Sequence, residues 1–443
     1  MFFGKPSFQS PLAKELWHMT LPMVFGIFSL LSFQLVDSAF IGQLGVQPLA
    51  AQGFTLPIQM IIIGLQVGLG IATTSIISRA LGANNTQYAR QLGGLVLLIG
   101  GVGIILFCLF IWVYWQTILS FLGAPQSLFG VIERYWPHWL LSAWLGAFIY
   151  FLNSICRANG NTMLPGVMMV VTSIVNVILD PLFIFTFGLG LNGAAMATSC
   201  AFLVGIIMAM LKIWQSHWVC FKWSNLDIAS SVKSISHIMG PALISQLLPS
   251  ISAVLATKLI ATFGAVAVGA WALGTRFEFF LLVVVLALTM SVPPMVGRLL
   301  GAKDYHQIEA LVGIAVKFVL LLQVFFALIA FVFSGLLAGW VTSDPNVEDS
   351  LRVYLMIVPI SLSSLGIGML MVSVSNAMGH SYVALTMSAL RLFAFFLPCI
   401  WLGAWIGDLE GVFVGVLFGN VFAGIAAWIM YKNVMRSLQQ GTV

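Results

Sequence analysis

Charged residues are scarce in this sequence of 443 residues. Only 7% are Asp, Glu, Lys or Arg and 60% are hydrophobic, whereas an average soluble domain has about 25% charged residues. A soluble protein with so few charges could not cover its surface with polar groups, so the composition excludes that class. The short alternating segments of a transmembrane β-barrel are missing too. Long unbroken apolar runs stand in their place and predict an all-α integral membrane protein.

Motifs of the common enzyme and pump classes are also missing. The sequence has no GxxxxGK[ST] loop for ATP phosphates and no HExxH or GxSxG motif. Its five cysteines are isolated and lack the paired spacing of a disulfide framework or a zinc site. We therefore expect neither an enzyme nor a resident metal or cofactor, apart from a coupling ion such as H⁺ or Na⁺.

Twelve apolar runs are long enough to cross a bilayer, which takes about 20 residues per helix. Charges, glycines, prolines and polar clusters bound these runs. They predict helices at 17–41, 53–79, 92–118, 129–154, 163–187, 191–213, 238–262, 274–297, 312–340, 352–376, 384–406 and 411–431.

The longest connection between predicted helices lies near residues 214–237 and separates two groups of six. We therefore assign 1–225 to an amino-terminal six-helix lobe with its cytoplasmic linker, and 226–443 to a carboxy-terminal six-helix lobe.

The distribution of charges predicts the orientation in the membrane. Basic residues such as Arg79 and Arg157 gather in loops on one side, while Asp344 and Glu348 fall on the other. Since cytoplasmic loops carry the excess of Lys and Arg, both termini are expected in the cytoplasm. The net charge of +5 then reflects loops that face anionic lipid, and no nucleic-acid partner is expected.

The two halves of the sequence align on each other at a nearly constant offset. Arg79–Ala83 matches Arg298–Ala302, and Ala158–Gly160 matches Ala377–Gly379, both with the same difference in numbering (298 − 79 = 379 − 160). We call this difference the repeat offset. Each repeat holds six spans, an even number, so both halves begin on the same side of the membrane and the repeat is parallel, with its pseudo-axis along the membrane normal. This pattern predicts two pseudo-symmetric lobes around a central cleft.

Two acids stand alone within the predicted spans. Asp37 is the only Asp, Glu, Lys or Arg from Leu16 to Ser78, and Asp180 is the only one from Ala158 to Leu211. A charged residue at the centre of a spanning helix costs about 2.5–3.5 kcal/mol on insertion scales. A partner, a bound cation, a proton or a water-filled cavity must offset this cost.

Polar neighbours accompany both acids. Asn176 precedes Asp180 by four residues, on the same face of the helix, and Gln34 precedes Asp37 by three. Such a group suits a proton or a small hard cation such as Na⁺. The alternative is that each acid caps a helix end or bonds a neighbouring helix, and Pro181 makes a kink at this point plausible on sequence grounds.

The second half lacks a counterpart of either acid, since the positions one repeat offset later hold Ala256 and Cys399 (256 − 37 = 399 − 180). It carries Arg276 and Glu278 instead, which we predict to form an ion pair at an outer helix end. Lys258 is expected to snorkel to the outer interface. Arg391 lies deeper, and the sequence assigns it no role.

These motifs resemble the multidrug and toxic compound extrusion (MATE) family over nearly the whole chain. The resemblance rests on Leu44–Ala51, Gly64–Gly70, Ser78–Ala83, Asn176–Pro181 and Asn192–Thr198, and in the second half on Gly264–Ala270, Arg298–Ala302 and Gly411. The absence of acids in the seventh and tenth helices favours its DinF-like branch.

The resemblance implies a set of site residues. Asp37, Asn176, Asp180 and Thr198 match the coupling site of that branch, and Pro22, Tyr135 and Asn153 fall where it has a kink proline and polar residues that line the lobe. Phe33, one turn before Asp37, departs from the tyrosine expected in some relatives.

The resemblance also implies a function. The family exports cationic, amphipathic small organic compounds in exchange for inward H⁺ or Na⁺ by alternating access, and the branch favours H⁺. We expect a monomer in the bacterial cytoplasmic membrane. A flippase of lipid-linked oligosaccharide, which has a related fold, remains the alternative, although it requires more buried basic residues than Arg391 offers.

Overall fold

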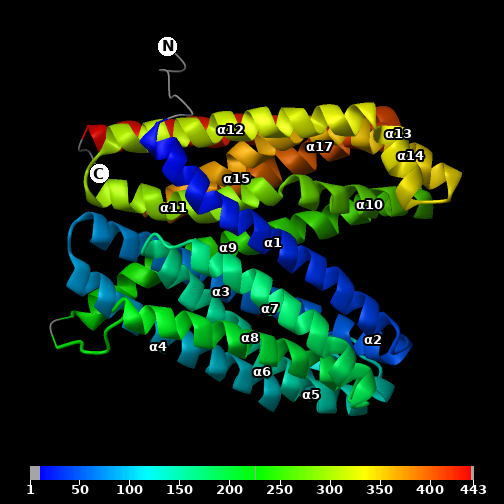
Figure 1. Ribbon diagram of the computed structural model, residues 1–443. Coiled ribbons are helices and arrows are strands. Elements are labelled where there is room, and N and C mark those ends of the chain that lie inside the picture. Colours follow the sequence, from blue (N-terminus) through cyan, green and yellow to red (C-terminus); the bar gives the residue numbers. More distant parts are fainter. Residues whose placement is uncertain (1–9, 225, 441–443) are drawn as a thin grey trace. The chain divides into compact units, whose positions relative to one another are not determined.

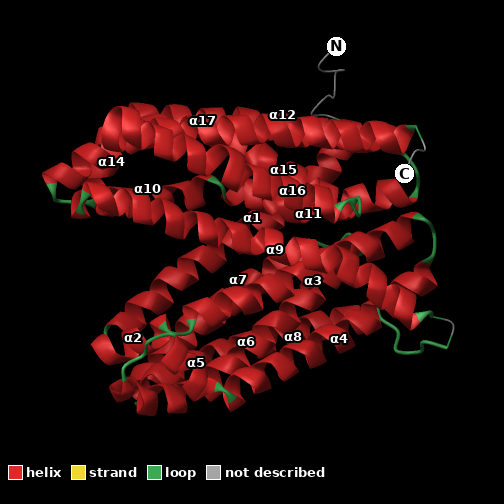
Figure 2. Cartoon of the chain, turned by 180° about the vertical axis from the view of Figure 1, so that it is seen from behind, coloured by secondary structure: helices red, strands yellow, loops and turns green. Residues whose placement is uncertain are grey.

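The computed structural model describes residues 10–224 and 226–440, and every regular element in these ranges is a helix (Figure 2). Residues 1–9 and 441–443 at the ends of the two predicted lobes, and residue 225 at their boundary, lie outside the described residues. Unbroken apolar sequence explains the absence of strands from the described part, because a helix satisfies its own backbone within the segment.

The first half of the chain forms ten helical elements (Figure 1). Their bounds are α1 Pro11–Gly42, α2 Val46–Gly53, α3 Leu56–Gly82, α4 Thr86–Val113, α5 Trp115–Phe121, η1 Gln126–Leu128, α6 Phe129–Ala158, α7 Met163–Pro181, η2 Leu182–Thr186 and α8 Gly190–Gln215.

The second half continues in the same manner. Its elements are α9 Ile228–Ile260, η3 Ala261–Phe263, α10 Ala265–Leu281, α11 Val283–Gly301, α12 Tyr305–Val332, α13 Ser334–Val341, α14 Pro345–Ile357, η4 Val358–Ser361, α15 Leu362–Ala377, α16 Ser381–Ala389, η5 Leu390–Phe396 and α17 Leu397–Gln439.

The predicted number of spans agrees with the structure once one long helix is divided. Eleven helical segments in the described part are long and apolar enough to cross a membrane. The longest, Ser381–Gln439, has non-helical backbone at Gly407 and Asp408, where Asp408 adopts a φ of 49°. This break separates two spans, so twelve result, as the sequence predicts.

The chain divides into two units whose boundaries differ from the predicted 225/226. The first, here called the N-unit, runs from Leu21 to Met239; the second, the C-unit, holds the residues from Gly240 on together with the start of α1 up to Thr20. The reason lies in the long helices α1 and α9, each of which contributes to both units. The two boundaries are one repeat offset apart (239 − 20 = 298 − 79), and each lies next to a proline within a helix, Pro22 or Pro241.

Side-chain packing explains this exchange of helix ends. In the C-unit, Leu16 and Met19 belong to the same buried cluster as Val292, and the hydroxyls of Thr20 and Ser291 lie 2.8 Å apart. The first turns of α1 are therefore held by α11, in the repeat that follows.

The repeat is visible in the backbone as well as in the sequence. Gly45 and Gly264 precede α2 and α10 with φ values of 99° and 97°. Asn85 and Asp304 cap α4 and α12, and each side chain accepts a hydrogen bond of 3.1 Å from the backbone N–H three residues later. Both pairs are separated by the repeat offset (264 − 45 = 304 − 85), so the two halves share turns and caps at equivalent places.

Each unit is built around one central helix. In the N-unit, α6 packs against α3, α4 and α8; in the C-unit, its repeat equivalent α15 packs against α11, α12 and α17. Trp136 and Phe151 of α6 are fully buried. In the N-unit, α8 packs in turn against α7, which carries one of the acids described next.

Candidate functional site

The two acids predicted within spans lie close together in the N-unit. Asp180 is fully buried near the end of α7, and Asp37 is half-buried in the last part of α1. The two carboxyl groups are near enough to interact electrostatically. Helices that are far apart in sequence therefore bring like charges together, which is unfavourable unless a cation or a proton intervenes.

The amide of Asn176 lies between Asp180 and Thr198. One of its two terminal atoms is 2.9 Å from Asp180 Oδ2, and the other is 3.1 Å from Thr198 Oγ1. Thr198 Oγ1 in turn lies 3.0 Å from the carbonyl oxygen of Ala194, one turn earlier in α8. The sequence-predicted residues Asn176, Asp180 and Thr198 thus form one chain of contacts from α7 to α8.

This chain has two consistent hydrogen-bond arrangements, which differ in the protonation of Asp180. When Asp180 is ionised, the Asn176 nitrogen donates to Asp180 Oδ2 and the amide oxygen accepts from Thr198 Oγ1 and from the Thr198 N–H. When Asp180 carries a proton, its O–H donates to the Asn176 oxygen, the amide nitrogen donates to Thr198 Oγ1, and that hydroxyl donates to Ala194. A single proton therefore reverses the two hydrogen bonds that Asn176 makes, with Asp180 and with Thr198 Oγ1, and turns the Thr198 hydroxyl from the amide to the Ala194 carbonyl.

Both carboxyl groups keep an unused oxygen. Within the described part of the chain, Asp37 Oδ1 and Asp180 Oδ1 are buried and have no hydrogen-bond partner. Tyr135 of α6 is buried and interacts electrostatically with Asp37. Buried polar atoms normally find partners, so these oxygens can receive a proton, a cation or water.

A small pocket opens beside Asn176 and Thr198. Besides these two residues, its walls are Leu30, Phe33, Thr172, Ser173, Ala201 and Phe202. The sequence analysis did not identify Thr172 and Ser173, although their spacing of four and three residues before Asn176 places them on the same face of α7. Phe33, the residue that departs from the expected tyrosine, lies in the pocket wall.

The end of α7 is shaped by Pro181 and the π-helical turn η2 that follows. Proline has no N–H, so the helix cannot continue its regular hydrogen bonding past Asp180. Gly193 of α8 packs directly on this turn, because a Cβ there would lie 2.6 Å from the Phe183 carbonyl oxygen. The Asn192–Thr198 motif thus contains a glycine that lets α8 approach the segment carrying Asp180.

The other predicted residues of the N-unit occupy different surroundings. Gln34 is exposed on α1, and Asn153 is buried in α6 with its Oδ1 unpaired among the described atoms. Pro22 packs against α7, where a Cβ on Gly166 would overlap the Pro22 carbonyl. The structure therefore joins Asp37, Asp180, Asn176, Thr198 and Tyr135 in one cluster and does not bring Gln34 into it in this conformation.

The ion pair predicted between Arg276 and Glu278 is wrong. Glu278 accepts a hydrogen bond from the hydroxyl of Tyr354 and interacts electrostatically with Arg391, while Arg276 is exposed. Residues two apart on a helix point to opposite faces, which explains the error. Lys258, expected to snorkel, is exposed near the end of α9.

The helix that carries Glu278 also begins earlier than predicted. Because α10 begins at Ala265 and not near residue 274, Glu278 lies more than three turns into the helix, or about 20 Å from its start at about 1.5 Å per residue. The acid therefore lies far from the start of α10.

Comparisons with known proteins agree on one family. The family model described as MatE matches residues 22–182 and 241–402, once in each repeat. A solved structure of the Vibrio cholerae MATE transporter VcmN in the bent form is 60% identical, covers 97% of this chain and 98% of its own, and superposes with a TM-score of 0.95.

Two curated relatives are more distant. A protein of Shewanella oneidensis described as an FAD transporter is 28% identical over 439 residues, 98% of this chain and 97% of its own. The multidrug export protein MepA of Staphylococcus aureus is 23% identical over 389 residues, 86% of this chain and 85% of its own. With the helical repeat and the apolar spans, these matches show that the chain is a multi-pass membrane transporter of the MATE family.

Proposed function

We propose that this transporter is a secondary antiporter that exports cationic, amphipathic organic compounds in exchange for inward H⁺, with Asp37 and Asp180 as the coupling groups. The observation that carries the proposal is the pair of acids on α1 and α7 that lie within electrostatic range of each other and, within the described residues, have no basic partner. Relatives described as multidrug exporters support the substrate class.

The geometry suggests how a proton acts on the helices. Protonation of Asp180 reverses the hydrogen bonds from Asp180 through Asn176 to Thr198, and so changes the hydrogen bonding between α7 and α8. Protonation also removes the electrostatic repulsion between the Asp180 and Asp37 carboxylates, which allows α1 to pack differently against α7. Pro22 gives α1 a point at which its hydrogen bonding is already interrupted. We propose that substrate leaves when the acids load, and that the ion is released in the cytoplasm.

Transport in everted membrane vesicles tests this assignment. Asp37→Asn and Asp180→Asn should each abolish dye uptake driven by a pH gradient. Asp227→Asn is the matched control, because Asp227 caps α9 through a 3.1 Å bond to the Ser230 N–H and asparagine caps equally well. Undiminished coupled transport in both aspartate variants would reject the proposal.

The coupling ion is identified in proteoliposomes with imposed gradients. Uptake that follows a pH gradient at equal Na⁺ on both sides would support H⁺, while uptake that requires a Na⁺ gradient would show that the same carboxylates take Na⁺ instead. Both ions suit a carboxylate with amide and hydroxyl neighbours.

A second candidate substrate is FAD, which the name of the Shewanella oneidensis relative suggests. Uptake assays with FAD and with a cationic dye, carried out in the same way, decide between the two substrate classes. A flippase of lipid-linked oligosaccharide would need basic side chains to hold a pyrophosphate, and no relative reported above is described as one. We also propose that the protein works as a monomer in the bacterial cytoplasmic membrane, with both termini in the cytoplasm.

A further inference from the structure

Part of the linker that follows α8 is held on the surface of α4. We call this segment, residues 218–223, the linker strap. Within it, the Cys220 N–H donates to the Arg90 carbonyl oxygen at 2.9 Å, and the Lys222 carbonyl oxygen accepts a hydrogen bond of 2.8 Å from Gln91 Nε2. Both contacts use the main chain of the strap, so they fix its course over the first turns of α4 within the N-unit.

Gly94 of α4 is the point where the strap comes closest to the helix. A Cβ on Gly94 would overlap the Cys220 carbonyl and would lie 3.4 Å from the Phe221 ring, so the absence of a side chain makes this approach possible. Its repeat equivalent in α12, Gly313, meets no atom within 4 Å (313 − 94 = 298 − 79). The strap is therefore a feature of the N-unit and not of the fold that the two repeats share.

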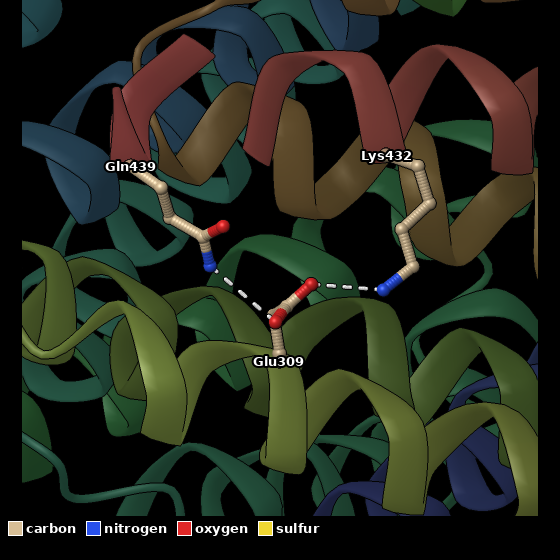
Figure 3. Close-up of polar contacts among 3 residues, drawn as sticks. All are labelled: Glu309, Lys432 and Gln439. Carbon is tan, nitrogen blue, oxygen red and sulfur yellow. Dashed lines mark hydrogen bonds and ion pairs between the residues drawn. The ribbon is translucent and has the colours of Figure 1, made fainter. Parts of the chain in front are cut away.

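The charges at this place also differ between the repeats. Arg90 is the repeat equivalent of Glu309 (309 − 90 = 313 − 94), and Glu309 is bound by Lys432 and Gln439 of α17 (Figure 3). Arg90 lies instead beside the strap, which contributes a second base, Lys222. Both bases are exposed, and neither forms an ion pair within the described residues. A neutralised pair in the C-unit thus corresponds to two uncompensated positive charges in the N-unit.

The surrounding sequence offers little negative charge to balance them. The loops at this end of the N-unit hold a single acid, Asp227, whose side chain accepts a hydrogen bond of 3.1 Å from the Ser230 N–H and so caps α9. Six bases lie at the same end, which is expected to face the cytoplasm: Arg79, Arg90, Arg157, Lys212, Lys222 and Lys233. Bases close to a membrane surface attract anionic lipid.

An apolar stripe continues from Arg90 along the same face of α4. Gly94, Leu98 and Val102 follow at intervals of four residues, which places them on one side of the helix. Leu98 and Val102 are 45% and 47% exposed, and Phe221 of the strap, beside Gly94, is 53% exposed. In a spanning helix such a stripe faces acyl chains. Positive charge at the start of the helix is therefore followed by apolar surface, in the order of the headgroup and chains of a phospholipid.

We propose that Arg90, Lys222 and Phe221 form a binding site for one anionic phospholipid of the cytoplasmic leaflet. The guanidinium of Arg90 and the ammonium group of Lys222 contact the headgroup phosphate, since arginine binds phosphate through two parallel hydrogen bonds. Phe221 packs against the first methylene groups, and the chains follow Leu98 along α4. Neither base has an acid beside it that could hold the ammonium group of a zwitterionic lipid, so the site favours a headgroup with a net negative charge.

Native mass spectrometry of the purified protein with added phosphatidylglycerol or phosphatidylcholine tests the proposal without substrate. The wild type should retain one phosphatidylglycerol molecule more tightly than phosphatidylcholine. The Arg90→Gln/Lys222→Gln variant should bind that molecule about tenfold more weakly, or worse. Lys14→Gln/Arg436→Gln is the matched control, because it removes two exposed bases from the C-unit. Equal losses in the two variants would reduce the effect to net charge and overturn the site.

A second pair of variants tests the strap while keeping every charge. Gly94→Ala should displace the strap and lose the tightly bound phosphatidylglycerol, whereas Gly313→Ala, which meets open space at the equivalent position, should keep it. A folded Gly94→Ala protein that binds the lipid as the wild type does would overturn a site built on the strap. If Gly94→Ala does not fold, the comparison of the charge variants decides, because both Arg90 and Lys222 are exposed.

Thermal unfolding in detergent distinguishes a lipid from a free phosphate ion. Phosphatidylglycerol should raise the apparent melting temperature of the wild type, because a ligand of the folded state stabilises it by mass action. The rise should be smaller in Arg90→Gln/Lys222→Gln. Inorganic phosphate at the same concentration should give no rise, since it has no chains to lie along α4. An equal rise with phosphate would show that the bases bind an anion of any kind and would overturn a lipid site.

Discussion

The amide of Asn176 stands between an acid and a hydroxyl, 2.9 Å from Asp180 Oδ2 and 3.1 Å from Thr198 Oγ1. An amide is suited to this place because its two ends differ only in whether they donate or accept. It can satisfy Asp180 in either protonation state by exchanging the two ends. A side chain that can only donate or only accept a hydrogen bond would satisfy Asp180 in one protonation state only.

Replacement of Asn176 by leucine tests this relay. Hydrogen bonds to a charged group contribute about 1.5–3 kcal/mol, so transport driven by a pH gradient should fall by roughly tenfold or more. Asn420→Leu is the control, since Asn420 is also a buried amide that donates to a hydroxyl, Ser361 Oγ at 3.0 Å, but lies in the C-unit. Equal losses in vesicle uptake for the two variants would contradict a relay at Asn176.

The sequence allowed the acids to be found but not all their partners. Asp37 and Asp180 are visible as lone charges in apolar runs, and Asn176 follows from helical spacing. The contact of Glu278 with Tyr354 joins residues 76 apart in the chain. No local pattern indicates such a contact, because it depends on how three helices pack.

At the scale of the element, the sequence and the structure differ on where one helix of the second half begins. The sequence predicts that the eighth span begins near residue 274. In the structure Gly264 ends the preceding turn with a φ of 97°, and α10 starts immediately at Ala265. The small residues after Gly264 therefore belong to a helix, and Glu278 lies further from the start of that helix than a start near 274 would place it.

The contact between α1 and α7 gives an element-scale prediction. Because a Cβ on Gly166 would overlap the Pro22 carbonyl, Gly166→Ala must move one helix. Overpacking of this kind costs about 1–3 kcal/mol, so the apparent melting temperature in detergent should fall. Gly103→Ala in α4 meets no atom within 4 Å and should be neutral or slightly stabilising. A Gly166→Ala protein as stable as the Gly103→Ala protein would show that α1 and α7 do not pack closely at Pro22 and Gly166.

The ends of α12 and α17 are joined by a polar contact (Figure 3). Lys432 Nζ lies 2.8 Å from Glu309 Oε1, and Gln439 Nε2 donates to Glu309 Oε2 at 3.4 Å. Both charged side chains are about one third exposed, at 37% and 35%. Solvent therefore screens the pair, and its contribution is expected to be about 0–1 kcal/mol.

A double-mutant cycle with Glu309→Gln and Lys432→Met measures this pair. The coupling energy from thermal unfolding should be at most about 1 kcal/mol and should shrink in high salt. Lys432→Met alone should have the larger effect, because Lys432 also lies 5.4 Å from the centroid of the Trp428 ring. A coupling of several kcal/mol, unchanged by salt, would mean that the contact is shielded from solvent.

At the scale of the whole molecule, the repeat was the most informative sequence feature. It predicted two units of six spans, and the family model matches once in each repeat. It did not predict that each unit takes the start of a helix from the other repeat, at Thr20 and Met239. That exchange depends on side chains such as Leu16 and Met19, which look like any other apolar residue until their packing partners are known.

Two serines provide a matched pair that tests the predicted topology. Ser224 lies in the linker after α8, and Ser343 lies between α13 and α14; both are exposed. With Cys200, Cys220 and Cys399 replaced by serine, Ser343→Cys should react with a membrane-impermeant maleimide in intact spheroplasts. Ser224→Cys should react only after permeabilisation, since the excess of Lys and Arg places its loop inside. The opposite pattern would place both termini outside. It would also invert the direction in which Asp37 and Asp180 face the proton gradient, so the coupled exchange proposed above would have to run from the other side.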